Sequence, residues 1–226
     1  MEVRSLRPGL WCWSAPHPDW TPAEGGPGGW SRDVWSLYCE APDATILIDP
    51  QAPPDDTPEA TRFWEALDRD VNRLGLPVAC LLTEGIHERS SGAVLARYRA
   101  GPGASVWVPA ASRGDVDGEV TNPFVPGDPL PGGLLTFPAA GANAPEVVYY
   151  LPAHRAAFAG DALVGEGDGR LRLGWINADA RAAVVAALRP LLDLPLEMVL
   201  DSHGRSALEH PREALAQALE LPSWDR

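Results

Sequence analysis

A strand, a capped helix and a second strand between residues 45 and 82 constrain the fold most strongly. Residues 45–49, TILID, are apolar and rich in branched side chains, which is typical of a strand. Thr57 and Pro58 then give a helix start signal, and Gly75 gives a stop signal. The strand at 78–82, VACLL, follows within a few residues. Because such a β-to-α-to-β unit places its strands in parallel, it predicts an α/β fold built in layers.

Further elements extend this unit in both directions. Residues 34–39 alternate as a strand does and should form a hairpin with 45–49 through the turn EAPDA. Residues 111–133, rich in Gly, Pro and Asp, predict an irregular connection. No repeat or long linker divides the chain, so we expect one domain over residues 1–226. The remaining expected elements are helices near 91–99, at 179–192 and from Pro211, and strands at 105–109, 134–137, 146–151, 156–160 and 197–200.

Charge and cysteine usage exclude several classes of function. The formal net charge is -13, and all 18 basic residues are Arg. Nucleic acids and anionic membranes are bound chiefly through basic side chains, so we expect neither as a partner. No apolar run has the length of a membrane span, and the N-terminus does not resemble a signal peptide. The three cysteines form no C-x-x-C pair, which argues against a disulfide framework and favours a cytoplasmic protein.

Three segments carry a family resemblance: LIDP at 47–50, FAGDALVG at 158–165 and LDSHG at 200–204, while LLTEGIHERSSGA at 81–93 stands in the place of a further polar loop. With the order of strands and helices, they resemble the metallo-β-lactamase fold superfamily over nearly the whole chain. The resemblance implies an αββα sandwich and a hydrolase ancestry. It also implies a two-metal site whose first ligands come from a T-H-x-H-x-D-H-x-G-G loop after a strand.

The chain departs from this metal-binding pattern at most positions. With Thr83 as anchor, Glu84 and Ile86 occupy the places of the first two His, Glu88 that of the Asp, and Arg89 that of the third His. Ala142 stands where the middle turn has a His. A guanidinium stays protonated and repels a divalent cation. An ordinary two-zinc site is therefore not expected.

Asp161 and His203 keep the family's ligand types, and the resemblance makes them the candidate catalytic residues. With Glu84 they could hold one divalent metal, zinc. An Asp and a His can equally form a plain hydrogen-bonded pair, since zinc usually takes about three protein ligands and a water. His87 lies one residue past a ligand position. It either points away from the site or turns inward through a one-residue shift.

The N-terminal part holds five of the nine tryptophans, around APHPDWTP at 15–22. They either cover the core or line a pocket for a flat or apolar ligand at the mouth of the family's active-site groove. His17, Asp19 and Trp20 would then be binding residues, as would Glu88 and Arg89 in the altered loop. The five are Trp11, Trp13, Trp20, Trp30 and Trp35.

Three functions follow, and the first is favoured on the sequence. One is a non-catalytic descendant of a hydrolase that binds a small molecule or a partner through the Trp-lined mouth. The alternative is a divergent metal-dependent hydrolase with a single metal at Asp161 and His203, completed by Glu84 or His87. Metal-free acid–base catalysis by His203 and a carboxylate is a third reading. We further predict that Arg89 pairs with Asp161, as the family's His and Asp share a metal.

Overall fold

The computed structural model describes residues 1–25, 29–140, 145–166, 169–174, 176, 178–203 and 209–221. The chain divides into two compact units. Unit 1 comprises residues 1–20 and 32–124, and unit 2 comprises residues 21–31 and 125–226. Within the described ranges, no helix combines the length and the apolar character needed to cross a membrane. The expectation of a single domain is not tested by this division and stays a prediction.

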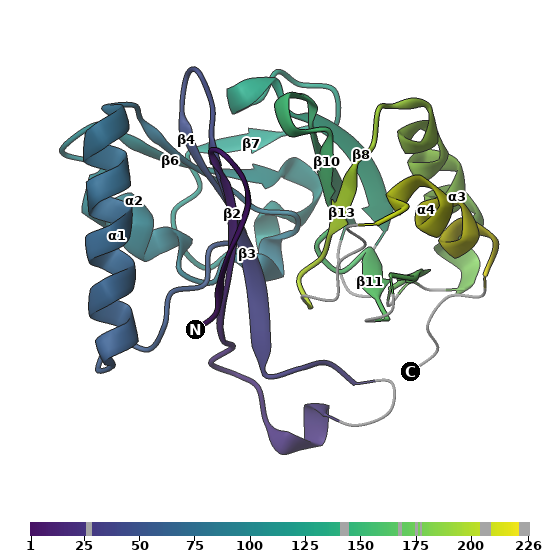
Figure 1. Ribbon diagram of the computed structural model, residues 1–226, viewed down its shortest axis with the longest axis horizontal. Helices are drawn as coiled ribbons and strands as arrows, with labels where there is room; N and C mark the ends of the chain where they lie inside the picture. Colours follow the sequence, from purple (N-terminus) through teal and green to yellow (C-terminus); the bar gives the residue numbers. More distant parts are fainter. Residues whose placement is uncertain are drawn as a thin grey trace. The chain divides into compact units, whose positions relative to one another are not determined.

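Unit 1 contains a seven-stranded sheet whose strands follow one another in sequence order (Figure 1). The first four strands pair antiparallel, and the strands from β4 to β7 pair in parallel. The parallel strand ends therefore lie along one edge, where α/β sheets commonly place ligands. The strands are β1 (Val3–Arg7), β2 (Leu10–Pro16), β3 (Asp33–Glu40), β4 (Thr45–Ile48), β5 (Val78–Leu81), β6 (Ala104–Pro109) and β7 (Asn122–Phe124).

The predicted β-to-α-to-β unit is confirmed. Helix α1 (Pro58–Leu74) connects the parallel strands β4 and β5. The Thr57 hydroxyl accepts a hydrogen bond from the backbone N–H of Ala60 at 3.2 Å, an N-cap that contributes about 1 kcal/mol. Gly75 ends the helix with a φ of 65°, a left-handed conformation that favours glycine. The hairpin of β3 and β4 is also confirmed.

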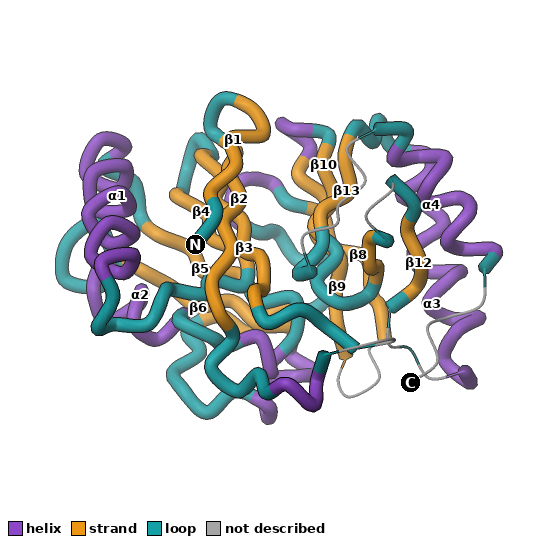
Figure 2. The backbone as a smooth tube through the Cα atoms, turned by 60° about the horizontal axis from the view of Figure 1, so that its bottom comes forward, coloured by secondary structure: helices purple, strands orange, loops and turns teal. Residues whose placement is uncertain are grey.

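Helices α1 and α2 (Ser91–Tyr98) lie beside this sheet (Figure 2). Their apolar side chains pack with those of the strands in one core. The strands contribute alternate residues, because successive side chains of a strand point to opposite faces. Each large apolar side chain buried here contributes about 1.5–3 kcal/mol. The core includes Phe63, Leu67 and Val71 of α1, Val94, Leu95 and Tyr98 of α2, and Leu47, Cys80, Val106 and Val108 of the strands.

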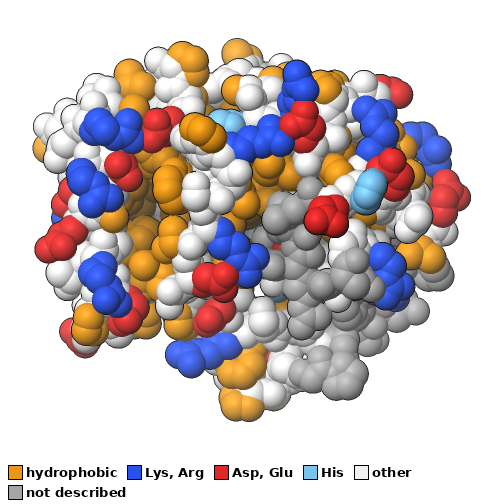
Figure 3. Space-filling view, in the orientation of Figure 1, with side chains coloured by type: hydrophobic (Ala, Val, Ile, Leu, Met, Phe, Trp, Pro, Cys, Tyr) orange, Lys and Arg blue, Asp and Glu red, His pale blue; other side chains and the backbone are white. Residues whose placement is uncertain are grey.

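Part of the Trp-rich N-terminal segment folds as the hairpin of β1 and β2. Trp13 lies on β2 in the core and donates from its indole nitrogen to the Gln51 carbonyl at 2.7 Å. Trp35 lies buried on β3, whereas Trp11 is 40% exposed. Trp11 lines an apolar groove of about 280 Å³ beside α1, and Figure 3 shows hydrophobic side chains gathered there. Core packing thus accounts for some of the five tryptophans, not all.

The segment 111–133 is more regular than expected. It holds most of a 3-10 helix at Ala110–Asp115, the strand β7 and a short turn at Pro131–Gly133. Strand β7 has only three residues, so no alternation of apolar and polar residues could reveal it.

Unit 2 contains a four-stranded sheet in the order β13, β10, β9, β8, and a separate pair, β11 and β12. Helices α3 (Arg181–Leu188) and α4 (Pro211–Glu220) pack against its core. The helix expected at 179–192 is α3 flanked by 3-10 turns at Ala178–Ala180 and Arg189–Asp193. The strands are β8 (Leu135–Ala140), β9 (Pro145–Leu151), β10 (Ala156–Phe158), β11 (Leu163–Gly165), β12 (Leu171–Leu173) and β13 (Met198–Leu200).

Candidate functional site

The polar side chains of unit 1 gather where β4 and β5 end. These strands pair in parallel with Ile48 opposite Leu81, so the residues that follow them become neighbours. Asp49 follows β4 directly, and Thr83 and Glu84 come just after β5. The backbone N–H of Asp49 donates to the Leu81 carbonyl at 3.1 Å. This hydrogen bond extends the pairing of β4 with β5 by one residue, to Asp49.

Asp49 organises this end of the sheet. Its carboxylate is fully buried and accepts from the Thr83 backbone N–H at 2.8 Å and from the Thr83 hydroxyl at 2.6 Å. His87 Nδ1 lies 3.0 Å from the same carboxylate. Because a carboxylate only accepts, Nδ1 carries the proton in this contact, and a neutral ring then presents its lone pair at Nε2.

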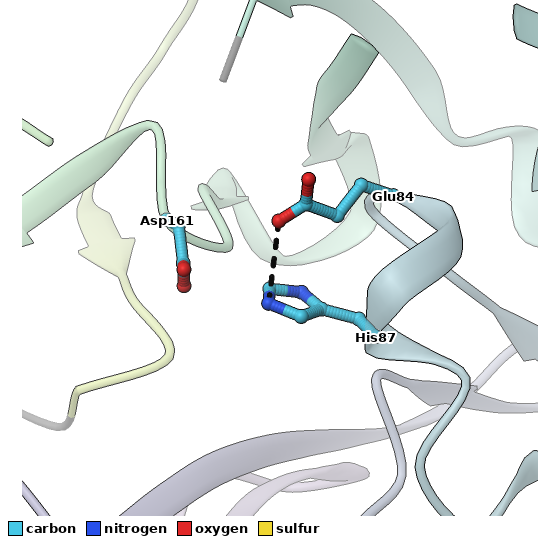
Figure 4. A group of neighbouring side chains, drawn as sticks. All are labelled: Glu84, His87 and Asp161. Atoms are coloured by element: carbon cyan, nitrogen blue, oxygen red, sulfur yellow. Dashed lines mark ion pairs between the residues drawn. The ribbon is translucent and has the colours of Figure 1, made fainter. Parts of the chain in front are cut away.

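His87 and Glu84 face one another (Figure 4). His87 Nε2 lies 3.4 Å from Glu84 Oε1, and both side chains are buried. A 3-10 turn at Gly85–His87 winds the chain so that His87 is 5% exposed and Ile86 is 47% exposed. His87 therefore takes the inward orientation of the two that were open, and Ile86 does not occupy a ligand's place.

Gly85 fits this turn tightly against the 3-10 helix at Ala110–Asp115. Its N–H donates to the Ser112 hydroxyl at 3.1 Å, and a Cβ on Gly85 would lie 2.1 Å from the Ser112 carbonyl oxygen. No side chain larger than hydrogen fits without moving backbone. This close approach fixes the backbone from which the side chains of Glu84 and His87 project.

Arg89 and Glu88 make other contacts in unit 1. Arg89 has a φ of 45°, and its Nη1 donates to the carbonyls of Trp35 at 3.1 Å and Asp49 at 3.0 Å. The Glu88 carboxylate accepts from the backbone N–H groups of Asp117 and Gly118, both at 2.9 Å. These contacts hold the loop in place. The predicted pairing of Arg89 with Asp161 joins residues of different units and stays a prediction.

Unit 2 holds the other two candidate ligands. Asp161 follows β10 and Gly160, and its Oδ1 lies 3.3 Å from His203 Nε2. The Trp30 ring meets the His203 ring edge-on, with centroids 6.2 Å apart. The buried Glu146 accepts from the Asp161 backbone N–H at 2.7 Å. The position of the family's middle-turn His, Ala142, lies outside the described residues.

Sequence reasoning missed Asp49, Glu146 and Asp201. The buried Asp201 carboxylate accepts from the backbone N–H groups of Gly165 and His203 and so orders the turn that carries His203. Both Asp49 and Asp201 stand directly after an apolar strand, in LID and VLD. A carboxylate directly after an apolar strand was the sequence feature that could have identified Asp49 and Asp201.

The N-terminal candidates lie in unit 1 near a cavity of about 560 Å³. His17 and Trp20 line it, together with Glu88 and Arg89 from the altered loop. The backbone N–H of Asp19 donates to His17 Nδ1 at 3.2 Å, and the Asp19 side chain is exposed.

No protein-family model and no curated protein matches this chain. Solved structures do match over nearly its full length. A metallo-β-lactamase from Pontibacter korlensis aligns with 98% of this chain and 99% of its own, at 18% identity and a TM-score of 0.61. The metallo-β-lactamase FIM-1 from Pseudomonas aeruginosa, in its mono-zinc form, aligns with 97% of this chain and 94% of its own, at 18% identity and a TM-score of 0.65.

A metallo-β-lactamase from Erythrobacter litoralis aligns with 97% of this chain and 90% of its own, at 20% identity and a TM-score of 0.61. Identities this low show the fold and leave the chemistry open. The similarity confirms the resemblance drawn from the three segments. The chain has the metallo-β-lactamase fold.

Proposed function

We propose that the protein is a metal-dependent hydrolase that holds a single divalent cation, with His87 and Glu84 as the ligands from unit 1. The observation that carries this proposal is the series Asp49, His87, Glu84. A carboxylate on one ring nitrogen of a histidine is the usual outer partner of a metal-binding imidazole, because it fixes the tautomer and raises the basicity of the other nitrogen. The contacts of Asp49 and Glu84 with the two nitrogens of His87 fit that arrangement.

The donor chemistry fits zinc. His87 Nε2 and Glu84 Oε1 lie 3.4 Å apart, so with the proton of the ring on Nδ1 one cation could bind both atoms. Imidazole nitrogen and carboxylate oxygen are both common zinc ligands, and zinc sites usually add a third protein ligand and a water. The family resemblance implies Asp161 and His203 as the further protein ligands, and this assignment stays a prediction. A bound zinc would lower the pKa of a coordinated water to near 7 and so supply a nucleophile.

Other residues of unit 1 would hold the two ligands, His87 and Glu84, in position. Asp49 holds the His87 ring by its Nδ1, and Thr83 holds Asp49 through two hydrogen bonds. Gly85 allows the turn that brings Glu84 and His87 to one side. Arg89 is held by two backbone carbonyls, so its guanidinium is restrained as a structural group rather than placed as a ligand.

A zinc titration tests the proposal directly. Protein treated with a chelator would be titrated with Zn²⁺ by calorimetry, and its metal content after purification would be measured by mass spectrometry. We expect one equivalent per chain in the wild type. His87→Asn should lose more affinity than the about 10- to 100-fold that is typical of outer partners. His210→Asn is the matched control, because His210 is exposed and Asn accepts its left-handed backbone.

The favoured reading of the sequence, a non-catalytic descendant, makes the opposite prediction. Replacement of the third His by Arg89 supports it, since a guanidinium cannot bind a metal. On that reading Zn²⁺ would bind no better to the wild type than to His87→Asn, and chromogenic ester and β-lactam substrates would not be turned over. Turnover that a chelator abolishes and Zn²⁺ restores would establish the hydrolase instead.

A further inference from the structure

The cavity of about 560 Å³ is built entirely from unit 1 and lies among segments that the metal proposal does not use as ligands. Its volume falls in the range of small-molecule sites, roughly 300–1,000 Å³. Five stretches line it: the end of β2 and the residues after it, Arg32 just before β3, the loop after β4, Trp64 of α1, and residues 88–93, which lead into α2. The backbone N–H of His17 donates to the Arg32 carbonyl at 2.9 Å and ties together two of the lining residues.

Two arginines, Arg32 and Arg89, are among the residues that line this cavity. Arg32 is exposed, and no carboxylate among the described residues of unit 1 pairs with it or with Arg89. Arg89 donates from Nη1 to two backbone carbonyls, and its buried Nε meets no hydrogen-bond acceptor among the described residues. Because backbone carbonyls carry no net charge, both cationic charges remain available to an anion.

The lining also holds two acidic residues, Glu88 and Asp55, and neither forms an ion pair with Arg32 or Arg89 among the described residues of unit 1. Both oxygens of Glu88 accept hydrogen bonds from the backbone N–H groups of Asp117 and Gly118. A Cβ on Gly118 would lie 2.1 Å from Glu88 Oε1, so the carboxylate is seated closely against that turn. Asp55 is an exposed side chain of the lining. Gly92 and Ala93, in the first turn of α2, also belong to the lining. The side chain of the N-cap residue Ser90 accepts no hydrogen bond from the backbone N–H groups of this turn.

The rest of the wall is flat and apolar. Trp20 and Trp64 line the cavity, and both are partly exposed. Trp64 is fixed in α1 by its edge contact with Phe63, at 5.0 Å between ring centroids. Fixed aromatic rings favour a planar ligand, which they can contact by offset or edge-on packing. The prolines of the lining add rigid apolar surface: Pro16, Pro18, Pro53 and Pro54.

We propose that this cavity binds a small planar aromatic carboxylate, with its carboxylate toward Arg32 and Arg89 and its ring among Trp20, Trp64 and the prolines. Arg is suited to this role because its planar fork matches the two oxygens of a carboxylate. The site requires no metal, so this proposal can be tested independently of the proposed hydrolase function.

Calorimetry and tryptophan fluorescence with 2-naphthoate test the proposal on the full chain in the presence of a chelator. We expect 2-naphthoate to bind with one equivalent and to change the fluorescence. Its neutral analogue 2-naphthamide should bind about tenfold more weakly or worse, as expected for loss of a charge-assisted hydrogen bond. Equal binding of the two compounds, or no binding of 2-naphthoate, would overturn the proposal.

Matched arginine variants locate the site. Arg32→Gln removes an exposed side chain without an ion pair in unit 1, so it should leave the fold intact and weaken 2-naphthoate about tenfold. Arg69→Gln removes an exposed Arg of α1 outside the cavity and should leave binding unchanged. Trp20→Leu should reduce both the affinity and the fluorescence change. If Arg32→Gln and Arg69→Gln behave alike, the ligand binds elsewhere and the assignment is wrong.

Discussion

Asp49, directly after β4, brings Thr83 and His87 together through its carboxylate. It is fully buried, yet its carboxylate is satisfied by the backbone and hydroxyl of Thr83 and by His87. Burial of an ionised carboxylate is costly unless such donors surround it. The same contacts make Asp49 a positioning residue, since they determine which nitrogen of His87 is left to bind another group.

Asp49→Asn tests this positioning role. The amide keeps the shape but brings an NH₂ group among the donors of Thr83 and His87, so at least one hydrogen bond is lost. We expect the affinity for Zn²⁺ to fall about 10- to 100-fold and the free energy of unfolding to fall by about 1–3 kcal/mol. Asp55→Asn, at an exposed site, is the control. Reduced stability with unchanged Zn²⁺ affinity would leave Asp49 a purely structural residue.

The sequence could place part of this site but not all of it. Strand ends indicated Glu84, Asp161 and His203 as candidates, because motifs at such ends are visible locally, and the joining of the three in one site stays a prediction. Asp49 and Thr83 are 34 residues apart, and only the register of β4 against β5 brings them together. The inward orientation of the His87 side chain depends on a 3-10 turn. Ser112, far along the chain, helps to fix that turn. Neither contact leaves a periodic pattern in the sequence.

At the scale of elements, prediction succeeded where a start or stop signal accompanied a long apolar period. Helix α1 had Thr57, Pro58 and Gly75, and both ends were located. The β1 and β2 hairpin was missed because β1 has only five residues and β2 carries a run of buried residues without alternation. Strands β7, β11 and β12 have three residues each. Pairing along the sheet defines strands that short, and no local propensity can substitute for it.

The contact between α1 and α2 gives a pH-dependent prediction. Asp68 of α1 accepts from Arg97 Nε at 2.7 Å and from the Tyr98 hydroxyl at 2.8 Å, both on α2. The hydrogen bond from Arg97 lowers the pKa of Asp68, and desolvation by burial opposes it. A carboxyl whose pKa is lower in the folded state adds stability above its unfolded pKa, about 3.9, and loses it as the pH falls through the folded pKa.

Asp68→Asn should therefore cost about 0.2–1 kcal/mol at pH 7, a small value because the pair is partly exposed to solvent. The difference from the wild type should stay constant down to about pH 5 and shrink below about pH 4. Urea unfolding at several pH values measures both. Asp56→Asn, at an exposed position before α1, should show neither effect. A difference that grows as the pH falls would contradict the assigned sign.

At the scale of the whole molecule, the path of the chain links the two units. Residues 21–31 belong to unit 2, but they connect β2 to β3, which pair along seven residues inside unit 1. Trp30 in this segment contacts His203 within unit 2. The chain therefore passes between the units at three places, after residues 20, 31 and 124. Unfolding of unit 2 would release a segment whose two ends are fixed in the sheet of unit 1.

We accordingly expect one cooperative unfolding transition for the 226 residues, in keeping with the single domain predicted from the sequence. Calorimetry should give equal calorimetric and van't Hoff enthalpies, and far-UV circular dichroism and tryptophan fluorescence should report the same midpoint. Trp30→Ala, which removes a contact inside unit 2, should lower the midpoint seen by both probes together. Trp11→Ala, at an exposed site on β2, should change it little. If Trp30→Ala instead separates the two probes into distinct transitions, the units unfold independently and the chain consists of two domains.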